Sequence, residues 1–298
     1  MELRTLQYFV QTVDAGTVTA AADRLHLTQP GLSRQLRQLE QELGVELFHR
    51  TGGRLTPTRA GQALLPLAQE VLARADALRV AATYQAQGRL ERVTIGAPLT
   101  TLRDVVAPFI ATLDADDPTP EVFQADGQTA AEVLGRGADL AVTSTPARAP
   151  YETKPLAVLP VWACVPRGHR WERRSRIRLA DLVEERLILP PGTFTSRAAL
   201  EAALRRDGLS YGGVVEAADG TVAQALAAAG RGVAVVSDDP QFELRPLSIR
   251  TGDGNLSVRL VSAWDSRHPA RAALEDIAGR LSQFVAERYG AQAKSLSS

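Results

Sequence analysis

The first sixty residues repeat apolar positions at the spacing of an α-helix. A first helix is predicted by residues that recur every three or four positions, namely Leu3, Leu6, Phe9, Val10 and Val13. Gly16 can end this helix, and Thr17 can cap a second one. The apolar face of the second helix comprises Val18, Ala21, Ala22 and Leu25. After the short connection His26-Leu27, Thr28 can cap a third helix with Pro30 in its first turn.

The third predicted helix has two contrasting faces. Its apolar stripe is Leu32, Leu36, Leu39 and Leu43, and Gly44 can end it. The opposite face is polar, and arginine, glutamine and serine are side chains that read bases or bind phosphates. The candidate DNA-binding residues of this segment are Thr28, Gln29, Pro30, Ser33, Arg34, Arg37 and Gln38. Taken alone, the helix fits a solvated charged face equally well.

A hairpin is predicted directly after this helix. Phe48 and Leu55 can enter the core, and the chain can turn at Gly52-Gly53. Arg50 and Arg54 flank the turn, so they join the candidate DNA-binding residues as a wing suited to phosphates or the minor groove. The three helices and the hairpin together predict a winged helix-turn-helix.

This segment resembles the LysR-type transcriptional regulators. The resemblance is carried by Phe9-Val10, Ala21-Ala22-Asp23-Arg24-Leu25, Thr28-Gln29-Pro30-Gly31-Leu32-Ser33-Arg34-Gln35-Leu36, Leu39-Glu40-Gln41-Glu42-Leu43-Gly44, Leu47-Phe48-His49-Arg50 and Leu55-Thr56-Pro57-Thr58-Arg59-Ala60-Gly61. Thr28 stands where the family usually has serine, and Gly31 where it usually has alanine. The resemblance extends more loosely along nearly the whole chain, and it implies a homotetramer and an effector-binding domain.

A long linker helix is expected from the cap Thr56 and from Pro57 to about residue 86, with a kink or local break at Pro66 and a hinge at 87–89. Two apolar series at heptad spacing form a candidate dimerisation seam: Leu64, Val71 and Leu78 with Ala68, Ala75 and Ala82. The alternative is that this face packs on its own domain. We favour dimerisation, because a helix of this length needs a partner.

The last two hundred residues alternate predicted strands and helices, which indicates an α/β fold with mostly parallel sheets. Residues 158–165 are predicted to form one strand. The resemblance implies two Rossmann-like lobes, like those of periplasmic solute-binding proteins, with crossings near Pro160 and Trp264. The expected domains are 1–58 (winged helix-turn-helix), 59–89 (linker) and 90–298 (effector-binding). Lobe 1 would contain 90–160 and 265–298, and lobe 2 would contain 161–264.

Ligands of such folds bind beyond the carboxyl ends of strands, where helices begin. The candidate effector-binding residues there are Leu99, Thr100, Thr101, Gln128, Thr129, Thr143, Ser144, Phe194, Thr195 and Thr221. This hydroxyl-rich set fits a small, anionic ligand held by exposed amides. Threonine and serine are also ordinary helix caps, so each of these residues has a structural alternative.

Composition and charge limit how the chain can bind DNA and which other sites it can contain. Net charge is zero and only one cysteine, Cys164, is present, so DNA binding must come from a local basic face and no internal disulfide can form. We predict a cytoplasmic location, because no signal peptide or transmembrane segment is recognisable. Cys164 fits a buried thiol, and 167–178, dense in arginine, fits a solvated loop better than a second DNA site. Neither a metal site nor a catalytic motif is found, and no cofactor is expected.

The sequence therefore predicts a regulator whose DNA binding or promoter activation responds to a small metabolite bound between the two lobes. Expected partners are double-stranded DNA with an interrupted inverted repeat, the effector and further copies of the chain as a dimer of dimers. RNA polymerase is a further candidate partner, and no membrane is expected. The rival hypothesis is a solute-binding or enzymatic module with the N-terminal segment as a packing appendage.

Overall fold

The computed structural model describes residues 2–51, 54–87 and 89–294. The chain divides into two compact units, which are described separately. Unit 1 contains Met1–Arg89, with which Gly135–Ala138 group, and unit 2 contains Leu90–Leu134 and Asp139–Ser298. In the described part of the chain, no helix is both long enough and apolar enough to cross a membrane.

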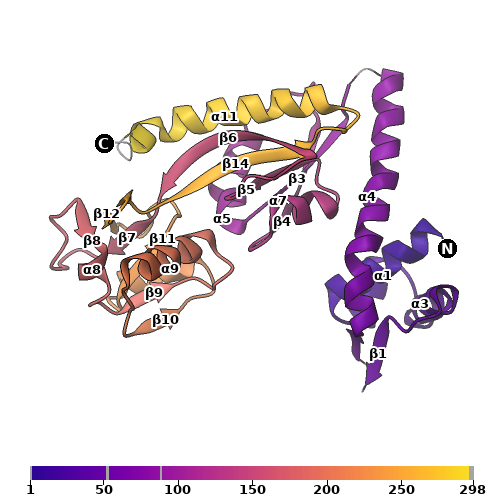
Figure 1. Ribbon diagram of the computed structural model, residues 1–298, viewed down its shortest axis with the longest axis horizontal. Coiled ribbons are helices and arrows are strands. Elements are labelled where there is room, and N and C mark those ends of the chain that lie inside the picture. The colour runs from indigo at the N-terminus through magenta and orange to yellow at the C-terminus, as the bar shows by residue number, and fades with distance from the viewer. Residues whose placement is uncertain (1, 52–53, 88, 295–298) are drawn as a thin grey trace. The chain divides into compact units, whose positions relative to one another are not determined.

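Unit 1 begins with the three predicted helices, which Figure 1 draws in indigo and violet. They are α1 (Leu3–Ala15), α2 (Val18–Arg24) and α3 (Gln29–Leu43). Gly16 and Gly44 adopt left-handed conformations after α1 and α3, with φ of 69° and 70°. Thr17 and Thr28 cap α2 and α3 through side chains that accept hydrogen bonds from the backbone N–H of Ala20 and Gly31, both at 3.2 Å. The predicted caps and stops are therefore confirmed.

One hydrophobic core unites these helices with the hairpin of β1 (Phe48–Thr51) and β2 (Arg54–Pro57). Phe48 is buried and meets Phe9 edge to face, with ring centroids 5.6 Å apart. Leu32, Leu36 and Leu39 are fully buried as expected. Leu43 is 37% exposed, which corrects its assignment to the stripe, because the last turn of α3 extends past the core.

The linker helix α4 (Arg59–Gln87) starts later than predicted. Thr56 and Pro57 belong to β2, and the cap is Thr58, whose hydroxyl accepts from the N–H of Gly61 at 2.9 Å. The same hydroxyl donates to the carbonyl of Glu46 at 2.7 Å, which ties the helix start to the base of the hairpin. The helix runs without interruption past Pro66, so the expected local break is wrong.

Unit 2 contains two separate mixed sheets, each flanked by helices, which we call lobe 1 and lobe 2. The five-stranded sheet of lobe 1 has the order β4-β3-β5-β14-β6. These strands are β3 (Arg92–Ala97), β4 (Thr119–Gln124), β5 (Leu140–Thr143), β6 (Tyr151–Pro160) and β14 (Ser257–Asp265). Its helices are α5 (Leu99–Thr101), the π-helical turn η1 (Leu102–Val106), α6 (Ala107–Ile110), α7 (Ala130–Gly135) and α11 (Arg271–Lys294). Figure 1 shows α11 lying along β6 and β14.

The seven-stranded sheet of lobe 2 has the order β10-β9-β11-β7-β12-β13, and β8 pairs with β12. The strands are β7 (Trp162–Val165), β8 (Arg176–Arg178), β9 (Leu187–Leu189), β10 (Val214–Glu216), β11 (Val233–Val236), β12 (Arg245–Thr251) and β13 (Gly254–Asn255). The helices are α8 (Leu179–Leu182), α9 (Thr195–Asp207) and α10 (Gly220–Ala228). Four-residue strands such as β7 and β11 are buried on every residue or nearly so, as expected for a sheet covered on both faces.

Three expectations for unit 2 are corrected. The sheets are mixed rather than mostly parallel, because β14 pairs antiparallel with β5 and β6, and β7 pairs antiparallel with β11 and β12. The single strand expected over 158–165 is two strands in different sheets, divided between Pro160 and Val161. The chain returns to lobe 1 near Leu256 rather than near Trp264, because all of β14 pairs within the sheet of lobe 1.

Candidate functional site

The outer face of α3 presents the candidate DNA-binding side chains to solvent. Gln29, Pro30, Arg34, Arg37 and Gln38 are exposed, while Ser33 is partly buried on the flank. Within the described part of the chain, the guanidinium groups of Arg34 and Arg37 form no ion pair. Both are therefore available to phosphates or base edges, whereas the amide of Gln38 is held by the carboxylate of Glu42 at 3.3 Å.

Glu40 lies near the C-terminal end of α3, a position that helix stability alone does not favour for a carboxylate. A carboxylate near a helix C-terminus interacts unfavourably with the helix dipole. In α3, however, Oε1 of Glu40 accepts hydrogen bonds from the backbone N–H of Leu47 at 2.9 Å and of Phe48 at 3.2 Å. The carboxylate thus joins the end of the helix to the base of the hairpin.

The predicted wing is present as paired backbone. Thr51 pairs with Arg54, and Arg50 pairs with Leu55. The expected turn at Gly52-Gly53 and the side chains of Arg50 and Arg54 lie outside the described residues.

The predicted dimerisation seam divides into two parts. Leu64 and Ala68 pack on the core of unit 1, so the first half of the seam follows the intramolecular alternative. Val71 is 42% exposed and Leu78 is 72% exposed, and Ala82 is exposed as well. Ala75 is partly buried. The second half of the seam is therefore an apolar surface that the described residues of unit 1 do not cover.

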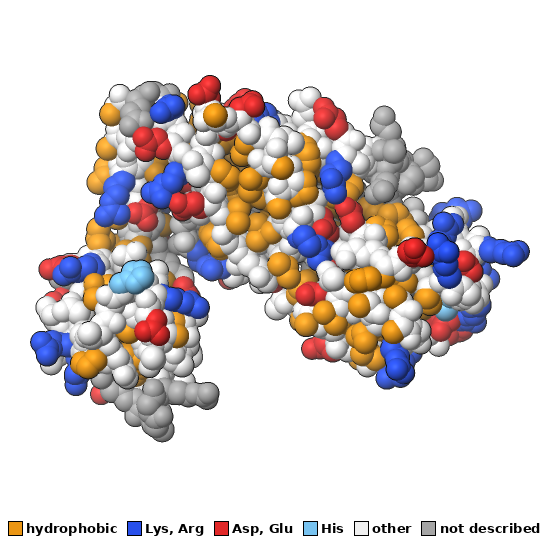
Figure 2. All heavy atoms as spheres, turned by 180° about the vertical axis from the view of Figure 1, so that it is seen from behind, with side chains coloured by type: hydrophobic (Ala, Val, Ile, Leu, Met, Phe, Trp, Pro, Cys, Tyr) orange, Lys and Arg blue, Asp and Glu red, His pale blue; other side chains and the backbone are white. Residues whose placement is uncertain are grey.

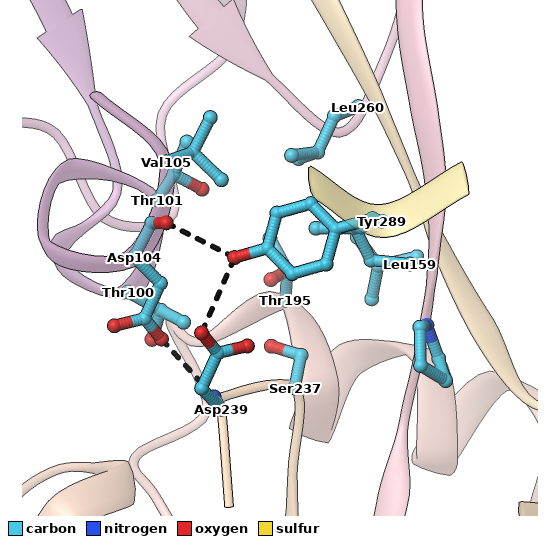
Figure 3. A pocket seen from close by; sticks show the side chains of 12 residues that line it. Thr100, Thr101, Asp104, Val105, Leu159, Thr195, Ser237, Asp239, Leu260 and Tyr289 are labelled. Atoms are coloured by element: carbon cyan, nitrogen blue, oxygen red, sulfur yellow. Dashed lines mark hydrogen bonds between the residues drawn. The ribbon is translucent and has the colours of Figure 1, made fainter. Parts of the chain in front are cut away.

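A pocket lies between the two lobes of unit 2 (Figure 3). One side carries hydroxyl and carboxylate groups, and the other is apolar. The lining residues are Thr100, Thr101, Asp104, Val105, Leu159, Pro160, Thr195, Ser237, Asp239, Val258, Leu260 and Tyr289. Lobe 1 contributes α5, η1, β6, β14 and α11, while lobe 2 contributes the start of α9 and the segment after β11.

Two short segments bring helix starts to this pocket. α5 begins after Pro98 and α9 begins after Phe194, and neither N-cap residue makes a side-chain capping hydrogen bond. At α5, however, the first N–H, that of Leu99, donates to the carboxylate of Asp126 at 3.1 Å. The first N–H groups of a helix have no intrahelical acceptors. Because Thr100, Thr101 and Thr195 line the pocket at these two helix starts, backbone donors from both lobes lie beside it.

Arg103 joins the lobes next to the pocket. Its guanidinium bonds both carboxylate oxygens of Asp104 at 2.7 and 3.0 Å, and it reaches lobe 2 at Asp238 and at the hydroxyl of Thr221, both at 2.6 Å. Asp238 is 1% exposed, so the carboxylate of this ion pair is buried, whereas the guanidinium of Arg103 is partly exposed. The hydrogen bond to Asp104 is the main cause that raises the pKa of Arg103 above its usual range.

Asp238 is held against the start of α10. A side chain at Gly220 would collide with the Asp238 carboxylate, so the close approach requires glycine there. Burial raises the pKa of Asp238 above its ordinary value, although the hydrogen bond from Arg103 opposes the shift. The hydroxyl of Thr100 lies 3.5 Å from the same carboxylate.

A second set of contacts crosses from α11 to the segment after β11. The guanidinium of Arg288 pairs with Asp239 at 3.1 Å, and the hydroxyl of Tyr289 donates to the same carboxylate at 3.4 Å or to the carbonyl of Asp104 at 3.0 Å. Figure 3 shows the Tyr289 ring over the pocket with its hydroxyl between Asp104 and Asp239. The backbone N–H of Asp239 also donates to Asp104 at 3.2 Å. The two lobes are therefore held together on the polar side of the pocket.

The structure brings only part of the predicted effector set to this pocket. Thr100, Thr101 and Thr195 line it, whereas Thr221 is not a lining residue and accepts a hydrogen bond from Arg103 next to the pocket. Leu99 and Phe194 adjoin these positions without lining the pocket. The other candidates lie elsewhere: Thr143 donates to the carbonyl of Thr145, Thr129 bonds Glu132, and Gln128 and Ser144 are not among the lining residues.

Sequence reasoning missed the charged part of the site. Ser237, Asp238 and Asp239 directly follow the buried strand β11, and polar residues at the carboxyl end of such a strand are a readable signal. Arg103 gave no sequence signal, because the pattern from about residue 101 to 113 predicts an ordinary helix. The structure has the π-helical turn η1 within that segment. π-Helical turns occur often at functional sites. Tyr289 gave no local signal.

Cys164 is fully buried in β7, and burial raises the pKa of its thiol to about 12. Its setting matches the expectation of an inert structural thiol. Among the residues that the structure describes, no group of three or more His, Cys, Asp or Glu side chains could hold a metal ion.

Two family models match the chain. Residues 3–62 match the bacterial regulatory helix-turn-helix protein of the lysR family, and residues 86–285 match the LysR substrate binding domain. Together they cover most of unit 1, except residues 63–85, and most of unit 2.

Characterised relatives extend over most of the chain. It is 29% identical over 293 residues to the nitrogen assimilation regulatory protein nac of Klebsiella aerogenes, covering 93% of this chain and 94% of the relative. It is 33% identical over 231 residues to the HTH-type transcriptional regulator CysB of Burkholderia cenocepacia, covering 74% and 72%.

Solved structures share the fold. Full-length CbnR in complex with its target DNA has a TM-score of 0.63 at 23% identity, covering 94% of this chain and all of that one. A full-length OxyR variant from Pseudomonas aeruginosa also has a TM-score of 0.63, at 22% identity, covering 96% and 95%. With a helix-turn-helix unit, a two-lobed unit and both family models in the expected order, the chain belongs to the LysR family of DNA-binding transcriptional regulators, which are not enzymes.

Proposed function

We propose that this regulator responds to a small, anionic metabolite bound in the pocket between the two lobes of unit 2. The observation that carries the proposal is the pair of helix starts, α5 and α9, which lie beside the pocket in opposite lobes. At α5 the N–H of Leu99 already donates to Asp126 at 3.1 Å, so the anion would bind the N–H groups of Thr100 and Thr101 there. Helix N-termini bind anions through free N–H groups and the helix dipole. The apolar wall of Val105, Leu159 and Leu260 suits the carbon skeleton of such a metabolite.

The response follows from the contacts between the lobes. An effector that binds both lobes changes how they close, and the change alters the arrangement of the DNA-binding pairs on an interrupted inverted repeat. It can act only through its difference in affinity for the two arrangements. We infer that the chain works in the cytoplasm as a dimer of dimers, with RNA polymerase as a further partner at the promoter. The exposed second half of the α4 seam supports self-association.

DNA binding is tested by footprinting the purified protein on the DNA upstream of its own gene at fixed salt. A protected stretch with approximate two-fold symmetry is expected. Arg34→Ala should weaken specific binding by about 1–3 kcal/mol, whereas Arg79→Ala, a change of an exposed arginine on α4, should leave it unchanged. Equal affinity of the two variants would remove Arg34 from the DNA-reading face.

Effector binding is tested by screening small carboxylates, with the matching amides and amines, for a shift of the footprint and of the unfolding temperature. Carboxylates should act and amides should not. Thr100→Ala should preserve DNA binding and blunt the response, while Thr129→Ala, outside the pocket, should change neither. A normal response of Thr100→Ala would place the effector elsewhere.

A second candidate effector has the opposite charge. The lining contains the carboxylates of Asp104 and Asp239 and no basic side chain, which favours an amine. Their charges are partly compensated by Arg103 and Arg288, which is why we favour the anion. A response to amines alone in the same screen would decide for the second candidate.

A further inference from the structure

The loop and strand that open lobe 2 carry an excess of positive charge in a chain whose net charge is zero. Residues 167–178 contain six arginines and a single carboxylate, Glu172. Figure 2 shows blue side chains gathered at the end of lobe 2 to which β8 belongs. Such clustering is not needed for solubility, which depends on charge spread over the surface.

Some of these arginines are used by the fold. Arg167 pairs with Glu243 at 3.1 Å, Arg170 with Glu185 at 2.7 Å, and Arg178 with Asp181 at 2.6 Å. Arg173, Arg174 and Arg176 are exposed and form no ion pair with any residue that the structure describes. The same is true of Arg250 on β12. These four residues, Arg173, Arg174, Arg176 and Arg250, are called the lobe 2 arginine surface.

The backbone that carries this surface is well anchored. Trp171 is 2% exposed, and its carbonyl accepts from the N–H of Arg174 at 2.8 Å. The N–H of Ser248 donates to the carbonyl of Ser175 at 3.0 Å, and Ile177 is buried under the sheet. Because the scaffold is fixed, little backbone entropy would be lost when the surface binds a partner.

Sheet pairing places like charges side by side. β8 pairs parallel with β12, and the register puts Arg178 beside Arg250 and Arg176 beside Ser248. Ile177 and Ile249 point into the core, so the arginines share the outer face. Like charges directly opposite one another destabilise a sheet. Asp181 forms an ion pair with Arg178, whereas Arg250 has no ion-pair partner among the described residues. The two neighbouring arginines therefore create a positive surface and do not stabilise the sheet.

The sequence alone favoured a solvated loop for 167–178. From the exposed arginines without an ion pair in the described part of the chain, we propose instead that the lobe 2 arginine surface is a second, sequence-independent DNA contact that binds the phosphate backbone of double-stranded DNA. Arginine forms bidentate hydrogen bonds to phosphate, and duplex DNA presents one charge about every 1.7 Å of its axis. The chain already holds DNA through its helix-turn-helix unit, which keeps this polyanion at a high effective concentration. Phosphates are the same at every base pair, so contacts to them would strengthen binding without choosing the sequence.

The test compares the salt dependence of DNA binding by the full chain and two triple variants. The first is Arg173→Gln, Arg174→Gln and Arg176→Gln together. The matched control is Arg148→Gln, Arg231→Gln and Arg259→Gln, three exposed arginines elsewhere in unit 2 with the same change in net charge. Affinity for a long duplex that contains the footprint and its flanks is measured between about 50 and 200 mM salt, the range over which phosphate contacts dominate.

The first variant should lower the slope of log K against log salt by about 2.7, since each phosphate contact contributes about 0.9. Over that salt range the difference corresponds to about a 40-fold change in relative affinity. The control should keep the slope of the unchanged chain. Changing Arg173, Arg174 and Arg176 to lysine should keep most of the slope of the unchanged chain, because lysine retains the positive charge.

Equal slopes for the first variant and the control would overturn the proposal. So would an unchanged slope combined with lost promoter activation, because the surface would then bind an acidic protein. A misfolded variant is recognised independently by tryptophan fluorescence, since Trp171 lies under the surface.

Discussion

Removal of the Arg103 guanidinium is expected to destabilise unit 2, by an amount that grows with pH. In Arg103→Ala, Asp238, which is 1% exposed in the unchanged chain, loses the partner 2.6 Å away. Breaking a buried ion pair by removing one member costs about 3–5 kcal/mol. The cost cannot exceed the free energy needed to protonate Asp238, because the neutral carboxyl no longer needs the ion pair. For a carboxyl of ordinary pKa at pH 7 this free energy is about 4 kcal/mol. Arg103 is itself 34% exposed, so we expect about 3 kcal/mol at pH 7.

The pH dependence follows from the raised pKa of Asp238. A carboxyl whose pKa is higher in the folded than in the unfolded state binds more protons when folded. Stability therefore falls as pH rises from the ordinary pKa through the raised one. Without Arg103 the pKa of Asp238 rises further, and this window extends upward. At pH 5 protonation of a carboxyl of ordinary pKa requires only about 1.5 kcal/mol, so the loss of stability can be no larger. The free energy of unfolding of the variant should therefore come close to that of the unchanged chain in acid.

Urea unfolding followed by tryptophan fluorescence measures this effect in unit 2 alone. All three tryptophans of the chain, Trp162, Trp171 and Trp264, belong to that unit. The matched control is Arg288→Ala, which breaks the other ion pair between the lobes. Its members are 41% and 43% exposed, so the expected loss is at most about 1 kcal/mol. Equal losses for both variants, or a loss for Arg103→Ala that does not change between pH 5 and 8, would refute the reasoning.

Three further predictions follow from individual positions. Cys164 should resist thiol reagents at pH 8 in the native chain and react only after unfolding, because its pKa of about 12 and its burial leave almost no accessible thiolate; rapid native labelling would contradict this. Gly220→Ala should destabilise unit 2 by about 1–3 kcal/mol in the same urea assay, since its methyl group collides with Asp238, whereas Gly290→Ala on α11 meets nothing within 4 Å and should not. Leu78→Glu should lower the mass measured by light scattering if the 72% exposed leucine belongs to a dimer seam, and an unchanged mass would exclude Leu78 from it.

The local features of unit 1 were predictable because their causes lie within a few residues. Thr17 and Thr28 cap helices through N–H groups three residues ahead, and the left-handed Gly16 and Gly44 end them. The polar face of α3 follows from helical periodicity alone. The same local reasoning placed the start of α4 two residues early, because Thr56 and Thr58 look alike until the hairpin pairing assigns Thr56 to β2.

In unit 2 the sequence determined the alternation of strands and helices and the threonines at helix starts, and the family resemblance implied the crossing near Pro160. The sequence could not determine which strands pair antiparallel or where the chain returns to lobe 1. In unit 1 it could not determine that the Glu40 carboxylate binds the backbone at the base of the hairpin. The ion pair between Arg103 and Asp238 joins residues 135 positions apart. Such contacts depend on how whole sheets and helices pack, whereas periodicity and capping depend on neighbours within about one helical turn. For that reason the sequence predicted the helix-turn-helix and three of the residues that line the pocket, and only the tertiary structure decided the charges that join the two lobes.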